Sequence, residues 1–175
     1  MNNLRYVEKK LDEFKERNNN LFFSSDLRVL FPTISDIAFR SRLFRMCKNK
    51  IIKKVIKNIY IYKEKNDWNI LYQIANKLRD NHFNYLSLES VLINEGLISQ
   101  QALQWITVMT TGRSNKIHCG EYGTIEFIKT TRVNSVSEHL HYDKQLQFWV
   151  ADIDLAKEDM KHTRRTLELV ENDNI

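Results

Sequence analysis

The apolar positions in the first third of the chain repeat at the spacing of amphipathic helices. Leu4, Val7, Leu11 and Phe14 predict a first helix from Leu4 to about Arg17. The asparagines at 18–20 are expected to end it, because asparagine tolerates the left-handed conformation of a helix stop. A second, short helix is expected between a serine cap and Pro32, with three apolar side chains directed inward: Leu27, Leu30 and Phe31.

A third helix is predicted after a cap at Thr33 or Ser35, and the rest of the chain is organised around it. On a helical wheel, one side of this segment gathers the apolar residues Ile37, Phe39, Leu43, Phe44, Met46, Cys47 and Ile51. The opposite side gathers, within roughly 120°, the residues Ala38, Ser41, Arg42, Arg45, Lys48 and Asn49. Arg40 and Lys50 break this pattern because they fall inside the apolar arc. We therefore expect one buried face and one cationic face.

A short basic β-hairpin is predicted directly after this helix. Its turn is expected at Lys57-Asn58, and its lysines flank that turn while alternate apolar residues face inward: Val55, Ile59 and Ile61. Three helices followed by a basic hairpin match the element order of a winged helix-turn-helix. In that module the second helix of the pair lies in the major groove of DNA.

Eight residues are therefore candidates for DNA binding: Ser41, Arg42, Arg45, Lys48, Asn49, Lys53, Lys54 and Lys57. Arg42 is placed to read guanine, and Arg45 and Lys48 to read bases or bind phosphate. The hairpin lysines are expected to contact phosphates, which adds affinity and salt dependence but little specificity. The alternative is that all these charges are simply solvated.

The charge of the chain is divided unevenly along its length. Residues 1–65 hold sixteen Lys and Arg against seven Asp and Glu, a net charge of +9, whereas residues 66–175 hold eleven against fifteen, a net charge of −4. Between Arg28 and Lys63 there are ten basic residues and a single acid, Asp36. This distribution favours a polyanion as the partner of the front part. The chain is thus expected to have two domains, 1–65 and 66–175.

The second part is predicted to alternate helices and strands. Asp67 is expected to cap a helix with the apolar residues Trp68, Leu71, Tyr72, Ala75 and Leu78 on one face. A short extended segment at 85–86 leads to a helix that Ser87 caps and Gly96 ends. Further elements are expected as a strand at 105–110, a hairpin at 116–130, a strand at 147–150 and a helix at about 154–170. The predicted fold class is α+β, a winged helix-turn-helix followed by a small mixed α/β domain whose tryptophans lie in the core.

Several motifs in this second part resemble those of a known family. The runs 85–92 (YLSLESVL), 107–113 (TVMTTGR), 123–128 (GTIEFI) and 148–151 (FWVA), with Ala156 and Asp159, are similar to the AbiEi-like antitoxins of type IV toxin–antitoxin (abortive infection) systems. In the front part, the run 42–45 and the basic hairpin fit the winged helix-turn-helix of that family. Asn49 and Asn58 stand where the family usually has glycine.

The resemblance implies a cytoplasmic DNA-binding antitoxin. Its N-terminal domain would bind inverted repeats in its own promoter and repress the operon. Its C-terminal domain would counteract a nucleotidyltransferase-like toxin encoded next door, without forming a stable complex with it. Two alternatives remain open: a plain winged-helix repressor whose second domain dimerises or senses a ligand, and a module whose basic front binds an acidic protein.

The residues do not predict an enzyme, a cofactor site or a metal site. The residues His118, Cys119, His139 and His141 lack the paired spacing of zinc ligands. The run 110–114 (TTGRS) lacks the glycines and the lysine of a phosphate-binding loop. No run is apolar and long enough for a membrane span, and the N-terminus has no apolar core of a signal peptide.

Overall fold

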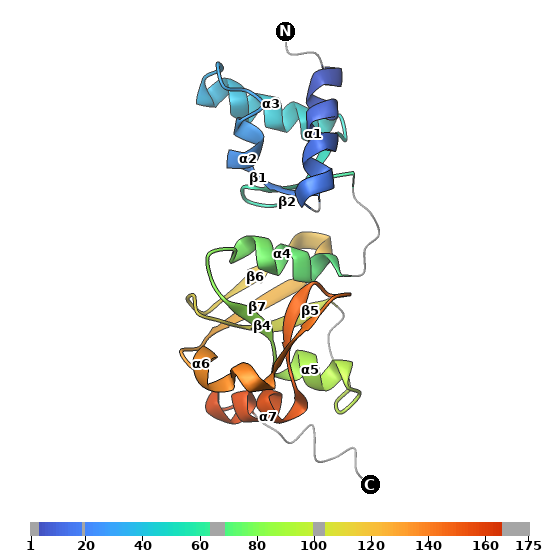
Figure 1. Ribbon diagram of the computed structural model, residues 1–175. Coiled ribbons are helices and arrows are strands. Elements are labelled where there is room, and N and C mark those ends of the chain that lie inside the picture. The colour runs from blue at the N-terminus through green and yellow to red at the C-terminus, as the bar shows by residue number, and fades with distance from the viewer. Residues whose placement is uncertain (1–3, 19, 64–68, 100–103, 166–175) are drawn as a thin grey trace. The chain divides into compact units, whose positions relative to one another are not determined.

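The computed structural model describes residues 4–18, 20–63, 69–99 and 104–165, and it is a mixed α+β structure with two separate sheets (Figure 1). The chain divides into two compact units, Met1–Asp67 (unit 1) and Trp68–Ile175 (unit 2). The boundary predicted from the sequence, between residues 65 and 66, lies two residues before this division.

Unit 1 contains three helices and a three-stranded sheet. In chain order its elements are α1 (Leu4–Asn18), β1 (Leu21–Phe23), α2 (Ser24–Arg28), α3 (Asp36–Lys48), β2 (Ile52–Ile56) and β3 (Ile59–Tyr62). The three predicted helices and the hairpin turn at Lys57-Asn58 are confirmed. The expected serine cap of α2 is wrong, because Phe23 occupies the cap position and Ser24 is already the first residue of the helix. Asn20 and Asn58 both adopt the left-handed conformation, with φ of 68° and 67°. Ser35 caps α3, because its Oγ accepts a hydrogen bond of 3.3 Å from the backbone N–H of Ala38.

Strand β1 was not expected from the sequence. It pairs antiparallel with β3, with Phe22 opposite Tyr60, so the sheet order is β1-β3-β2 and not a hairpin alone. Three residues are too few to show the alternation of a strand, and the partner strand lies almost 40 positions further along the chain. The backbone N–H of Ser24 also donates to the carbonyl of Asn58 over 2.8 Å, which fixes the start of α2 beside the hairpin turn.

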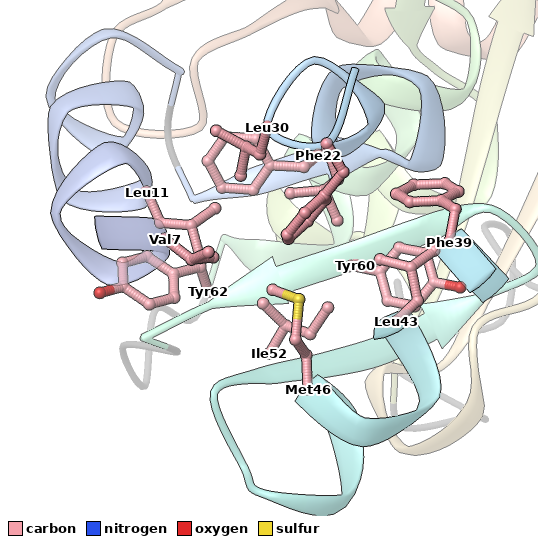
Figure 2. Close-up of a cluster of buried hydrophobic side chains, with 12 residues drawn as sticks. Val7, Leu11, Phe22, Leu30, Phe39, Leu43, Met46, Ile52, Tyr60 and Tyr62 are labelled. Atoms are coloured by element: carbon pink, nitrogen blue, oxygen red, sulfur yellow. The ribbon is translucent and has the colours of Figure 1, made fainter. Parts of the chain in front are cut away.

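A single hydrophobic core joins these elements. Figure 2 shows side chains of α1, β1, α3 and the hairpin directed toward one another. They include Val7, Leu11, Phe22, Phe39, Leu43, Met46, Ile52 and Tyr60. Tyr62 closes the end near α1, where its hydroxyl donates to the carboxylate of Asp12 over 3.1 Å. Because this core packs α3 against the sheet that contains the hairpin, the outward surfaces of α3 and of the hairpin have a fixed relation to each other.

The predicted apolar face of α3 was wrong for two residues. The buried positions are Phe39, Leu43 and Met46, whereas Ile37 is 79% exposed and Phe44 is 71% exposed. The helix buries a narrow stripe at positions i, i+4 and i+7, and both exceptions lie outside it. A wheel that assigns every apolar residue to the core therefore made the buried arc too wide.

Unit 2 is built on one six-stranded sheet. Its elements are α4 (Ile70–Leu78), β4 (Asn84–Leu86), α5 (Glu89–Asn94), β5 (Trp105–Thr110), β6 (Asn115–His118), η1 (Gly120–Tyr122), β7 (Thr124–Lys129), α6 (Val133–Val136), η2 (Ser137–His139), β8 (Leu140–Asp143), β9 (Phe148–Ala151) and α7 (Ile153–His162). The predicted strand at 105–110, the hairpin within 116–130 and the left-handed Gly96 are confirmed. The predicted cap at Asp67 lies outside the described residues.

The strand order of this sheet is β6-β7-β5-β4-β9-β8. The pairs β5/β7 and β4/β9 are parallel and the others are antiparallel, so the sheet is mixed. Figure 1 shows α4 on one face and α5, α6 and α7 on the other. Gly123 is required where β7 begins, because a Cβ there would lie 2.0 Å from the carbonyl oxygen of Gln104.

Three expectations for unit 2 are corrected. Ser87 does not cap α5, because its side chain instead donates to Asp159 over 2.7 Å. Trp149 is 40% exposed and is not a core residue, and Trp68 lies outside the described residues. The last helix ends at His162, before the predicted end, and Arg164 adopts the left-handed conformation that follows a helix stop.

Of the described helices, none combines the length and apolar character needed to cross a bilayer.

Candidate nucleic-acid interface

The outward surface of α3 and its C-terminal cap carry four of the eight predicted DNA-binding residues. Ser41, Arg45 and Lys48 are exposed on the helix, and Asn49 is exposed at its C-terminal cap. Asn49 keeps an ordinary backbone conformation with φ of −83°. The left-handed position after the helix is Lys50, with φ of 57°, so asparagine does not replace glycine at residue 49 as the resemblance implied.

Arg42 differs from the other predicted residues because it is half-buried. Its guanidinium carbon lies 5.6 Å from the ring centroid of Phe31, which is a favourable cation–π distance. A guanidinium held against the segment that precedes α3 is less free to reach a base edge. The structure therefore gives Arg42 a contact that supports the helix, in addition to any contact with a ligand.

Arg28 fixes the connection between α2 and α3. Its guanidinium donates to the carbonyl of Phe31 and, over 2.6 Å, to the carbonyl of Ile34. It also lies 5.1 Å from the ring centroid of Phe39 and 3.6 Å from the carboxylate of Asp36. One side chain thus satisfies two backbone acceptors in the turn and contacts the first two turns of α3. These contacts connect the turn to the start of α3.

The hairpin places two of its lysines, Lys54 and Lys57, close to α3, and Lys53 does not line the groove that they share with the helix. Lys54 and Lys57 are exposed, and Lys53 is half-buried. The two-residue connection Lys57-Asn58 makes the tip short, and a shift in the strand register between Lys54 and Ile56 bends β2 next to it. The hairpin is therefore a compact basic projection beside the helix.

A groove of about 800 Å³ lies between α3, the start of α2 and the hairpin tip. Four cationic side chains line it: Arg28, Arg40, Lys54 and Lys57. Its acidic lining residue among the described residues is Asp36, which lies near Arg28. The groove therefore has a predominantly positive rim. Opposite walls of like charge, separated by a channel, suit a polyanion that passes between helix and hairpin.

The floor of the groove is apolar. It includes Phe39 and Leu43 of α3 and Tyr60 of β3, and the thiol of Cys47 also lines it. Burial raises the pKa of the Cys47 thiol and of the Tyr60 hydroxyl. Both groups therefore stay protonated near neutral pH, and the charge of the groove comes from its arginines and lysines.

Comparison of the sequence with models of known protein families found none that matches, and comparison with curated proteins found no match either. The interpretation of the interface therefore depends on its residues and their geometry.

Sequence reasoning missed three members of this surface: Arg28, Arg40 and Phe44. Arg40 was set aside because it interrupted an apolar arc, yet it is exposed and lines the groove. The signal for Arg28 was available in the sequence, since it is the first of the ten cations between residues 28 and 63. Phe44 gave no such signal, because only the packed structure shows which apolar residues of α3 stay exposed.

The other candidate chemistry in the sequence lies apart from this surface, in unit 2. The ring of His118 lies 3.2 Å from the hydroxyl of Thr124, and that of His139 lies 2.7 Å from the carboxylate of Asp152. Cys119 is buried. Within the ranges that the structure describes, no three His, Cys, Asp or Glu side chains are grouped as metal ligands.

Proposed function

We propose that unit 1 binds double-stranded DNA as a winged helix-turn-helix, with α3 in the major groove and the hairpin on neighbouring phosphates. The observation that carries this proposal is the groove between α3 and the hairpin, which four cationic side chains line: Arg28, Arg40, Lys54 and Lys57. Arg45 and Lys48 add exposed positive charge on α3 outside the groove lining. The element order supports it, because α3 and the hairpin share one core and border the same groove.

The residues in this interface have different roles in the proposal. Arg45, with Ser41 beside it, faces the bases, because both project from the exposed side of α3. Lys54 and Lys57 bind phosphates and supply salt-dependent affinity. Arg42 and Arg28 hold the turn and the helix in position, since both have contacts within unit 1.

An in vitro selection with the full chain and random duplexes tests this function. The expected result is enrichment of one sequence. Arg45→Ala should weaken binding to that site by about 1–3 kcal/mol and relax the preference at one position. Lys57→Ala should weaken all duplexes alike. Failure of the wild-type chain to bind any duplex at low ionic strength would exclude the proposal.

We further propose that the protein is the antitoxin of a type IV toxin–antitoxin system, which represses its own operon through unit 1 and counteracts a nucleotidyltransferase-like toxin through unit 2. The motifs of the family resemblance support this, and they come together in unit 2. The run 85–92 forms β4 and the start of α5, and it contacts the runs 107–113 and 148–151 through strand pairing. A plain repressor remains the alternative.

Growth rescue separates these two functions in the full-length protein. The adjacent gene is expressed together with the wild-type chain or with an Arg45→Ala/Lys54→Ala/Lys57→Ala variant, both from an unrelated promoter. The antitoxin proposal predicts that both proteins restore growth and that only the wild type represses a reporter carrying its own upstream region. Repression without any rescue by the wild type would favour the plain repressor.

A further inference from the structure

Two large apolar side chains stand on the most exposed part of α3. Ile37 is 79% exposed and Phe44 is 71% exposed, and their spacing of seven positions places both on the same side of the helix. Ser41 and Lys48 lie on that side as well, because positions 37, 41, 44 and 48 follow one another at helical spacings of four, three and four residues. This stripe is opposite to the buried residues Phe39, Leu43 and Met46 of the helix.

The surroundings of this apolar pair are predominantly cationic, although an exposed acid, Asp36, lies next to Ile37. Arg40 flanks the stripe on the side of the groove, and Arg45 flanks it on the other side. Across the groove stand Lys54 and Lys57. A partner that meets Ile37 and Phe44 must therefore be strongly anionic and still offer small apolar groups. The major groove of DNA has this combination, because the 5-methyl group of each thymine projects into a channel bordered by phosphates.

We propose that Ile37 and Phe44 determine sequence specificity by contacting thymine methyl groups in the major groove. This inference rests on the proposed DNA binding and adds to it an apolar part of the recognition. Seven residues of helix span about 10.5 Å, which corresponds to about three base-pair steps of 3.4 Å. The contacted thymines are thus expected about three steps apart in the preferred site.

Replacing thymine by deoxyuridine, which lacks the methyl group, tests this contact. Duplexes carrying the site selected by the full chain are made with single thymine-to-uracil changes, and dissociation constants are measured at one salt concentration. The wild type is expected to bind about fourfold more weakly when a contacted thymine is replaced. This factor corresponds to the ~0.8 kcal/mol gained by burying one methylene-sized group, since about 1.4 kcal/mol changes an affinity tenfold. Phe44→Ala or Ile37→Ala should bind the thymine site more weakly and lose the thymine preference at its own position.

Tyr6→Ala is the matched control, because Tyr6 is an exposed aromatic residue of α1, outside the surface of α3. This variant should keep the full thymine preference.

Equal binding of thymine and uracil sites by the wild type, at every position, would overturn the inference while leaving DNA binding intact. The inference would also be overturned if Phe44→Ala kept the thymine preference but changed the association state of the protein. Ile37 and Phe44 would then be covered by a second copy of the chain. Absence of any selected duplex would instead remove the proposed function and this inference with it.

Discussion

The hydroxyl of Ser87 donates a hydrogen bond of 2.7 Å to the carboxylate of Asp159, 72 positions further along the chain. Asp159 is fully buried, and it also accepts hydrogen bonds from the hydroxyl of Tyr85, over 3.1 Å, and from the guanidinium of Arg132. Burial raises the pKa of this carboxyl group, and the hydrogen bond from Ser87 opposes that effect. The network joins β4 to α7, so residues that carry the family resemblance have a structural role in unit 2.

Removing this network is expected to destabilise unit 2. Asp159→Ala removes the buried acceptor of Ser87 and Tyr85, while Arg132 keeps its ion pair with Glu158, and should lower the free energy of unfolding by about 3 kcal/mol. Ser87→Ala removes one donor to a buried carboxylate and should cost about 1–3 kcal/mol. Urea denaturation of the full chain measures both changes. If the Asp159 variant unfolded at the same urea concentration as the wild type, the network would not contribute to stability.

Leu88, next to Ser87, has a backbone conformation that side chains rarely adopt, with φ of 59° and ψ of −141°. Its side chain is buried, so both Leu88→Ala and Leu88→Gly lose packing. Only glycine also relieves the backbone strain, which costs about 1–3 kcal/mol at such positions. We therefore expect Leu88→Gly to be more stable than Leu88→Ala by about 1 kcal/mol, the reverse of the usual order. Thermal denaturation distinguishes the two, and a more stable alanine variant would contradict the assignment of strain.

Arg28 is predicted to stabilise unit 1 through the turn before α3. Arg28→Ala removes two hydrogen bonds to the carbonyls of Phe31 and Ile34 and should cost about 1.5–3 kcal/mol. Arg40→Ala is the control, because it removes the same charge from an exposed position and should change stability by less than about 0.5 kcal/mol. Chemical denaturation of both variants gives the comparison. Equal stability of the two would mean that the turn does not depend on Arg28.

The pair formed by His139 and Asp152 predicts a pH dependence of stability. The hydrogen bond with Asp152 raises the pKa of His139 above its ordinary value of 6.5. The resulting stabilisation is complete below pH 6.5 and is lost as the pH rises through the raised pKa of the folded state. Melting temperatures of wild type and His139→Gln should therefore differ at pH 6 and converge at higher pH. A difference in melting temperature that did not change with pH would contradict this role of the pair.

The regular elements were largely predictable because local rules decide them. Ser35, Asn58 and Gly96 mark helix and turn boundaries through their own backbone or capping preferences, and each does so in the structure. Tertiary partners decide what the sequence did not reveal. Ser87 can cap a helix, but a buried carboxylate 72 residues away competes for its hydroxyl.

In the candidate interface, too, some features follow from the sequence and others depend on tertiary packing. The positive charge of α3 and of the hairpin follows from composition, and the exposure of Arg45, Lys48, Lys54 and Lys57 agrees with it. The exposure of Phe44 does not follow, since its apolar side chain predicts burial. A helical wheel cannot distinguish an apolar residue needed by the core from one available to a ligand.

The salt dependence of duplex binding by the full chain tests the central claim most directly. Dissociation constants of the wild type and of Lys54→Ala/Lys57→Ala are measured at several salt concentrations between about 50 and 200 mM. The logarithm of the binding constant is then plotted against the logarithm of the salt concentration, and the slope is compared between the two proteins. The account predicts a steep loss of affinity with salt, and a slope in the double variant that is smaller by about 1.8, because each phosphate contact contributes ~0.9. Unchanged slopes, or no binding at the lowest salt concentration, would contradict a DNA interface made by α3 and the hairpin.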